Sequence, residues 1–190
     1  MEGKVIVIGG CPRAGKTTLS VKLVKSGLGF SKISMDYFGE AMNAGLHKYE
    51  GIAKDDFEVI NTLLDKLVYD AEAYGINSIF DYCGYDFPPE DMEKLSFKDK
   101  LDIYFFGFSD DISADEIKYT IKHYAKPTDW ISYVDDDYIG KVSKRIYEFN
   151  KELKKQCEKY NYRFINTGVG EKREIILNSL YDEIIASCSK

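Results

Sequence analysis

The chain has 190 residues, of which 44% are hydrophobic and 31% are charged, and its net charge is −6. This is the composition of a globular domain, and the acidic balance without a basic face or tail makes nucleic acid an unfavoured partner. The sequence shows no apolar run of about 18 residues, no signal peptide before its first apolar run and no CxxC pair among its four cysteines, so we expect a cytoplasmic protein with no membrane partner.

Strand-like and helix-like runs alternate along the chain. Short runs of apolar and β-branched residues predict strands at residues 4–8, 32–35, 78–81, 102–106 and 163–166. Helices are predicted over residues 17–25, 57–74, 139–160 and 176–184, the last three from apolar stripes at helical spacing. The alternation predicts a single α/β domain over residues 1–190. It has three layers, a five-stranded parallel sheet with right-handed crossovers and helices on both faces.

The segment between the fourth and fifth predicted strands is the least regular part of the chain. Residues 107–140 are polar and include an acidic run at residues 135–137. Loops of this length inside a compact domain are usually functional covers. We therefore predict short helices here and a lid over residues 109–140, inserted in the domain rather than forming a second one.

The first predicted strand leads directly into a phosphate-binding loop. The pattern G-x-x-x-x-G-K-[ST] is matched at every fixed position by Gly10, Cys11, Pro12, Arg13, Ala14, Gly15, Lys16 and Thr17. We call residues 10–18, which include Thr18, the phosphate loop. Its glycines let successive N–H groups point at phosphate oxygens, and the following helix adds its positive N-terminal dipole. Lys16 reaches the β- and γ-phosphates and Thr17 offers a hydroxyl to Mg²⁺. The cofactors expected are therefore ATP and Mg²⁺.

Two aspartates follow predicted strands and should meet the phosphate loop at the carboxyl edge of the sheet. Asp36 would hold an acceptor hydroxyl or take its proton; alternatively it caps the next helix. Asp81 ends an apolar strand, where it would hold Mg²⁺ through a water; alternatively it is a turn residue before Gly84. In either case the two carboxylates should converge with Lys16 at one edge of the sheet.

Cys11 allows two interpretations, and the stretch that begins at Asn150 is compared with a GTPase motif. Cys11 is expected to be exposed near a helix N-terminus, where a thiol pKa falls and the side chain becomes sensitive to oxidation. It could also be a small filling residue. Asn150-Lys151-Glu152-Leu153 lacks the aspartate of a GTPase motif and lies inside a predicted helix, so a GTPase is not favoured.

These features together resemble the nucleoside-monophosphate-kinase-like group, which includes adenylate, shikimate, gluconate, uridine and nicotinamide riboside kinases. The resemblance rests on the phosphate loop, the two aspartates, the late lid and the final strand with its Asn-Thr-Gly turn, residues 166–168. It implies that Asp36 is catalytic or holds substrate, and that Gly168 and Val169 contact the nucleotide. The chain also resembles uncharacterised bacterial AAA-type P-loop kinases that carry an Asp-Trp pair in the lid, here Asp129-Trp130.

The chain departs from that group in its arginines. The lid residues 107–140 contain none, and Arg145 on the following helix is the nearest. Arg145 or Arg13 would then brace the transferring phosphoryl group, or lysines would substitute without bidentate geometry. These lysines are Lys118, Lys122, Lys126 and Lys141.

The reaction that we predict follows from this scarcity of arginine. Because no arginine lies between Arg13 and Arg145, a nucleoside monophosphate is not favoured as acceptor. We predict transfer of the γ-phosphoryl group of ATP to a hydroxyl of an uncharged or weakly charged small molecule, by a monomer or a homodimer. The alternatives are a nucleotide-dependent regulatory ATPase and a nucleic-acid end kinase.

Overall fold

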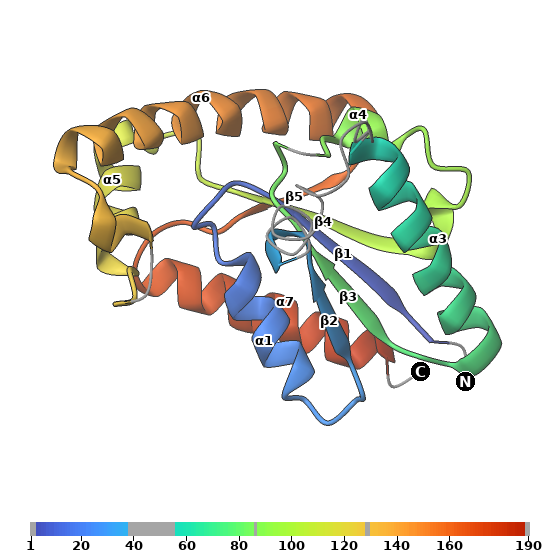
Figure 1. Cartoon of the computed structure of the whole chain (residues 1–190). Coiled ribbons are helices and arrows are strands. Elements are labelled where there is room, and N and C mark those ends of the chain that lie inside the picture. The colour runs from blue at the N-terminus through green and yellow to red at the C-terminus, as the bar shows by residue number, and fades with distance from the viewer. Residues whose placement is uncertain (1–2, 38–55, 86, 128–129, 189–190) are drawn as a thin grey trace, which may run out of the picture.

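The computed structural model of the chain describes residues 3–37, 56–85, 87–127 and 130–188. Its centre is a sheet of five parallel strands in the order β2-β3-β1-β4-β5 (Figure 1). The strands are β1 (Val5–Gly10), β2 (Ser31–Ser34), β3 (Ser78–Asp81), β4 (Leu101–Gly107) and β5 (Arg163–Asn166). The predicted five-stranded parallel α/β fold is therefore confirmed, and each strand lies where its sequence pattern predicts it, with bounds that differ by at most two residues.

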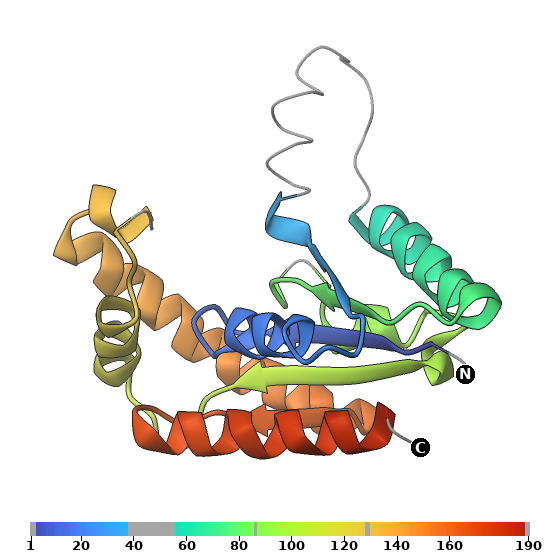
Figure 2. The same ribbon diagram turned by 90° about the horizontal axis from the view of Figure 1, so that it is seen from below.

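Helices cover both faces of this sheet, which gives the three predicted layers. The longer helices are α1 (Lys16–Val24), α3 (Asp56–Tyr74), α5 (Ala114–His123), α6 (Asp136–Tyr160) and α7 (Glu171–Cys188). Shorter turns are α4 (Pro89–Met92), η1 (Lys98–Lys100) and η2 (Trp130–Tyr133). Helices α1 and α7 pack on one face, whereas α3 and α6 lie on the other (Figures 1 and 2). None of the described helices is long and apolar enough to cross a membrane.

The core is built around β1, the middle strand. All six residues of β1 are buried, as are all four of β3. A strand covered on both faces has no polar side to alternate with, which explains the continuous apolar run over residues 5–8. This packing fixes the carboxyl end of β1, and therefore the position at which the phosphate loop begins.

The predicted lid contains α5 and η2. Helix α5 begins with a capping box, in which the Ser113 hydroxyl accepts from the Glu116 N–H and the Glu116 carboxylate accepts from the Ser113 N–H. Its apolar side packs against α6, with Ile117 and Ile121 fully buried. The expected short helices are therefore present, and closure of this segment over substrates stays a prediction. Asp129 and the side chain of Trp130 lie outside the described residues.

Candidate nucleotide and metal site

The phosphate loop requires glycine at both of its fixed glycine positions. Gly10 has φ +117° and Gly15 has φ +97°, in the left-handed region that side chains disfavour. A Cβ on Gly10 would lie 2.1 Å from the Phe106 carbonyl oxygen, which leaves no room for any side chain. Hydrogen bonds from Cys11 N–H to Phe106 O (2.7 Å) and from Gly84 N–H to Gly10 O (3.0 Å) join the loop to its neighbours. The loop is thus held in shape by the sheet beneath it.

Lys16 lies over the loop that precedes it. Its ammonium donates to the carbonyl oxygens of Gly10 (3.0 Å) and Cys11 (2.8 Å), and its side chain is half-buried. Helix α1 begins at Lys16, and its N-cap residue, Gly15, has no side chain that could cap the first turn. The N–H groups of that turn are therefore oriented toward an anion that binds at the helix N-terminus.

Asp81 and Thr17 meet beside the loop, as the two candidate metal residues should. The Asp81 carboxylate is buried, and its Oδ2 lies 3.4 Å from the Thr17 hydroxyl and 3.4 Å from the Ser20 hydroxyl. A hydroxyl and a carboxylate are hard oxygen donors of the kind that Mg²⁺ takes, so these residues fit the ion. Its remaining ligands would be phosphate oxygens and water. The turn interpretation of Asp81 does not explain why two hydroxyls from α1 converge on it.

Asp36 follows β2, at the same edge of the sheet. Residues 35–37 are helical and directly follow the last residue of β2, Ser34. The side chain of Asp36 is exposed. The acceptor-site and capping interpretations of Asp36 both stay predictions. Residues 38–55, which continue the chain from this point, lie outside the described residues.

The expectation that Cys11 is exposed and sensitive to oxidation is wrong. The side chain is fully buried, and burial raises the pKa of its thiol to about 12. The loop backbone faces outward while the Cys11 side chain points inward, where its thiol donates to Asn150 Oδ1 (3.5 Å). Cys11 is therefore the small filling residue of the second reading, and its thiol is neither exposed nor activated.

Asn150 explains the Asn-Lys-Glu stretch that the sequence left without a role. It is buried on α6, and its amide bonds both backbone groups of Phe108, accepting at 2.7 Å and donating at 3.2 Å. Because Phe108 follows β4 directly, Asn150 braces the end of that strand and the underside of the phosphate loop together. Its role is structural.

Arg145 lies on α6, one helical turn before Phe149. The Phe149 ring packs on Tyr85 with centroids 4.0 Å apart, and Tyr85 directly follows Gly84, which bonds the phosphate loop. Burial raises the pKa of Tyr85 to about 12, and the charge of Arg145 opposes that shift. Arg145 is exposed. The structure thus brings the positive charge of Arg145 to the strand-end side of the sheet, where the candidate site lies.

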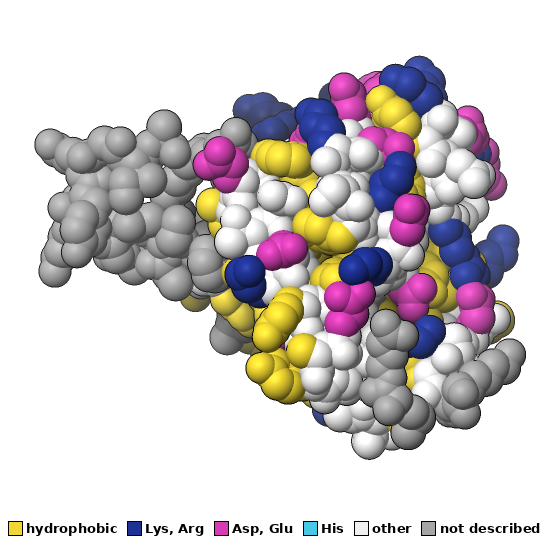
Figure 3. Space-filling model, turned by 90° about the vertical axis from the view of Figure 1, so that its right-hand side faces the viewer, with side chains coloured by type: hydrophobic (Ala, Val, Ile, Leu, Met, Phe, Trp, Pro, Cys, Tyr) yellow, Lys and Arg dark blue, Asp and Glu magenta, His cyan; other side chains and the backbone are white. Residues whose placement is uncertain are grey.

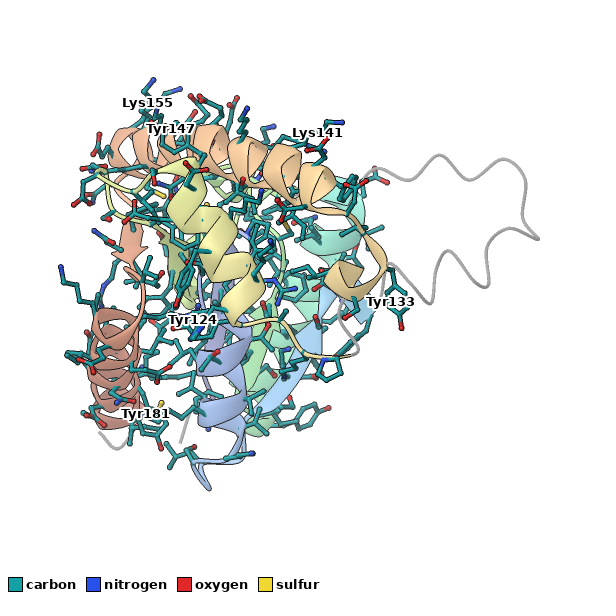
Figure 4. All side chains as sticks on the ribbon, turned by 90° about the vertical axis from the view of Figure 1, so that its left-hand side faces the viewer. Tyr124, Tyr133, Lys141, Tyr147, Lys155 and Tyr181 are labelled. Carbon is teal, nitrogen blue, oxygen red and sulfur yellow. The ribbon has the colours of Figure 1, made fainter. Side chains whose placement is uncertain are left out.

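The lid lysines differ in what they contact. Lys118 and Lys122 both pair with Asp136 at the start of α6, the first at 2.5 Å. Lys141 is exposed and points outward from α6 (Figure 4). Lys118 and Lys122 are therefore both paired at the start of α6. A lysine that substitutes for a lid arginine would first have to leave Asp136 or move with the lid.

Gly168 and Val169 line a groove of about 540 Å³ between the loop after β4 and the start of α7. Ser109 and Asp111 form the opposite wall. No phosphate-loop residue is among those that line it. The structure therefore places the Gly168 turn at the correct edge of the sheet but does not join it to Lys16 in one cavity.

Arg173 is a candidate site residue that the sequence reasoning missed. It lies in the first turn of α7 with 5% of its side chain exposed. Its Nε would lie 3.2 Å from a Cβ on Gly15, so the guanidinium supports the phosphate loop from behind. Among the described residues no hydrogen-bond acceptor reaches its buried Nη1, and burial lowers its pKa. The signal available in the sequence was its rarity, as one of four arginines, three residues after Gly170.

The surface of the described residues carries charges of both signs. On the side of the molecule that includes α3, acidic and basic side chains alternate with apolar ones rather than forming one basic patch (Figure 3). Strong nucleic-acid binding depends on continuous positive charge. This face therefore has none of the electrostatic character that a nucleic-acid-binding surface needs.

Comparisons with known proteins find the same fold. No protein-family model matches the sequence, and no curated protein matches it either. A shikimate kinase from Bacteroides thetaiotaomicron is similar, with a TM-score of 0.59, 17% identity, and coverage of 95% of this chain and 98% of the other. The corresponding values are 0.55, 17%, 97% and 94% for a shikimate kinase from Acinetobacter baumannii in complex with shikimate. For a gluconokinase from Sinorhizobium meliloti 1021 they are 0.51, 13%, 98% and 97%. The chain therefore shares the fold of these three proteins over nearly its whole length.

Proposed function

We propose that this protein is a kinase that transfers the γ-phosphoryl group of ATP to a hydroxyl of a small molecule. The observation that carries the proposal is the convergence of Lys16, Thr17 and the buried Asp81 at a phosphate loop with the required glycine conformations. Support also comes from the fold, which is shared with proteins named shikimate kinase and gluconokinase. Sequence identities of 13–17% are too low to assign the substrate of either protein to this chain.

Each residue has a defined task in the proposed reaction. Backbone N–H groups of residues 10–18 hold the phosphates, and Lys16 supplies a fixed positive charge where negative charge develops. Thr17 and Asp81 would hold Mg²⁺, Asp81 through a water. When bound, the ion neutralises the β- and γ-phosphate charge. The protein's contribution is mainly position and electrostatics, since phosphoryl transfer asks little covalent chemistry of the enzyme.

The acceptor is placed beside Asp36. The exposed carboxylate there can accept a hydrogen bond from the attacking hydroxyl, and it can take the proton as the new P–O bond forms. Arg145, with Arg13, would brace the transferring group from the opposite side. We infer an uncharged or weakly charged acceptor, because the sequence has no arginine between Arg13 and Arg145 that could bind the phosphate of a nucleoside monophosphate.

We also propose roles for the lid and for the turn at Gly168. Residues 1–190 act as one domain, the lid at 109–140 closes over both substrates, and Gly168 and Val169 contact the nucleotide. Closure would exclude water and so limit wasteful ATP hydrolysis. Hydrogen exchange in the lid should therefore slow when nucleotide and acceptor are added together, and equal exchange in both states would contradict a lid. The protein acts as a monomer or homodimer in the cytoplasm.

The test is ATP turnover with and without a panel of alcohols, sugars, nucleosides and oligonucleotide ends. Phosphorylation of a small hydroxyl compound, lost in Lys16→Ala, supports the proposal. Removing one such preorganised charge commonly lowers the rate about 10²- to 10³-fold. The control is Lys22→Ala, six residues further along α1, whose Nζ donates to Asn178 instead. Acceptor-independent hydrolysis would favour a regulatory ATPase, and labelling of oligonucleotides alone would favour an end kinase.

A further inference from the structure

Lys32 is a half-buried basic residue that has no task in the reaction proposed above. It lies on β2, the edge strand, on the same face of the sheet as Ser34. The register of β2 and β3 pairs Ser34 with Asp81, so the Lys32 side chain runs along this face toward that carboxylate. The Lys32 Nζ lies 3.0 Å from Asp81 Oδ2, and the two side chains are only 16% and 5% exposed.

This ion pair occupies the candidate metal carboxylate. The Oδ2 that Lys32 contacts is the same oxygen that lies 3.4 Å from the Thr17 hydroxyl and 3.4 Å from the Ser20 hydroxyl. The Lys32 ammonium also lies 5.8 Å from the centroid of the Tyr37 ring, next in sequence to Asp36. Lys32 therefore stands between the metal residues and the proposed acceptor residue.

Two cations cannot share one buried carboxylate without repulsion between them. Like charges a few Å apart repel strongly where the effective dielectric constant is near 20, and water screens such a buried pair poorly. A Mg²⁺ ion that approaches Asp81 therefore meets the ammonium of Lys32 already bound. Without the ion, the same ammonium keeps the buried carboxylate from being an unpaired charge, which would be strongly destabilising.

We propose that Lys32 is the resident counter-cation of Asp81 in the nucleotide-free protein and that Mg²⁺ binding requires Lys32 to release this carboxylate. Lys32 is thus a positioning residue that sets the Mg²⁺ concentration at which the site assembles. Release would leave its ammonium near Asp36 and Tyr37, on the acceptor side. The inference rests on the proposed function, because it takes Asp81 as the metal residue.

A purely structural role for Lys32 predicts a different result. An inward-pointing charge on an edge strand can protect that strand from pairing with another chain, and a buried ion pair can simply stabilise the fold. In either case the loss of Lys32 would change stability or association. Neither case changes the Mg²⁺ dependence of nucleotide binding.

The experiment measures that dependence directly on the full chain. MgCl₂ is titrated into protein with a fluorescent, non-hydrolysable ATP analogue, and the Mg²⁺ concentration for half-maximal binding is compared among variants. Lys32→Gln keeps a polar side chain and removes the charge. We expect it to lower that concentration about threefold to tenfold, the direction set by removing a nearby repulsive charge. Lys32→Arg keeps the charge and should retain the wild-type value.

The matched control is Lys98→Gln, which removes a 2.6 Å ion pair with Glu93 away from the phosphate loop. It should leave the Mg²⁺ titration unchanged. An unchanged or raised Mg²⁺ requirement in Lys32→Gln overturns the inference, as does an equal decrease in the control. If the wild type itself binds the analogue without any Mg²⁺ dependence, the proposed function fails and this inference fails with it. The two failures are therefore distinguishable.

A second measurement needs no variant. Amine-reactive labelling followed by mass spectrometry reports the accessibility of Lys32 in the wild type, with Lys98 as the internal standard. With the analogue present throughout, adding Mg²⁺ should increase labelling of Lys32 severalfold relative to Lys98. No change in this ratio would show that Lys32 stays on Asp81 when the metal binds, and would overturn the inference even if Lys32→Gln fails to fold.

Discussion

The guanidinium of Arg173 lies over the ring of Tyr124, with its Cζ 4.2 Å from the ring centroid. Tyr124 is the C-cap residue that directly follows α5, and Figure 4 shows it at the end of α5 nearest α1. The same guanidinium packs behind Gly15 of the phosphate loop. One buried side chain thus joins the lid, the last helix and the nucleotide loop.

This relationship predicts energetic coupling between Arg173 and Tyr124. Arg173→Lys keeps the charge but loses the flat stack, and Tyr124→Leu keeps apolar volume but loses the ring face. Each is expected to lower the free energy of unfolding by about 1 kcal/mol, and the double variant by less than the sum. Urea denaturation of the four proteins measures this. Additive losses of free energy would mean that the two side chains are not coupled. Arg163→Lys is the control for an Arg-to-Lys change at an exposed site, where the partner is Glu183.

Asp36→Asn is expected to abolish most phosphoryl transfer. General-base and hydroxyl-holding groups contribute about 10²- to 10⁴-fold in rate, whereas ATP affinity should stay nearly unchanged because the phosphate loop is intact. Turnover, ATP binding and thermal stability are measured on this one variant. Asn caps helices about as well as Asp, so full activity with unchanged stability would return Asp36 to the capping interpretation.

Asp81→Asn is expected to raise the Mg²⁺ concentration needed for half-maximal activity. It should also destabilise the protein, because Lys32 then faces a neutral amide in a nearly buried position. Breaking a buried pair by removing one partner is costly, and with 16% of Lys32 exposed we expect about 1–3 kcal/mol. Mg²⁺ titration and urea denaturation give the two quantities, and an unchanged Mg²⁺ titration would indicate a turn residue. Asp65→Asn, which affects an exposed pair with Lys66, should change neither.

Cys11 is expected to resist alkylation at neutral pH in the folded protein. Burial raises the pKa of its thiol to about 12, so almost no thiolate forms at neutral pH. The reagent also cannot reach the sulfur, because the side chain is fully buried. Cys83 and Cys188 are half-buried and should react first. Timed iodoacetamide labelling with mass spectrometry ranks the four cysteines, and early labelling of Cys11 would contradict its burial.

The same pKa shift gives a sign for the pH dependence of stability. The folded protein holds the Cys11 proton above the ordinary thiol pKa of 9.0, whereas the unfolded chain releases it there. This contribution to stability is therefore present below pH 9 and is lost as the pH rises toward 12. Between pH 9 and pH 12 the free energy of unfolding should therefore fall less in Cys11→Ala than in the wild type. Denaturation at several pH values measures this difference.

The sequence by itself determined the features that depend on local pattern. Short runs of apolar and β-branched residues predicted all five strands, and the run over residues 5–8 is continuously apolar because β1 is buried on both faces. The phosphate loop was predicted from residues 10–17, because the glycines, the lysine and the hydroxyl that bind phosphate and metal all lie in one short contiguous segment. Asp81 was placed correctly beside Thr17 because parallel strands bring their carboxyl ends to one edge.

Only the tertiary structure decided which side chains meet across that edge. Cys11 contacts Asn150, which is 139 residues away in sequence, and this buried position decides between the exposed thiol and the small filling residue that the sequence left open. Lys32 reaches Asp81 from the edge strand, and Arg173 reaches Gly15 from the last helix. Nothing in the spacing of these residues marks them as partners. Their burial and their electrostatic roles arise from packing between distant elements, which sequence periodicity does not encode.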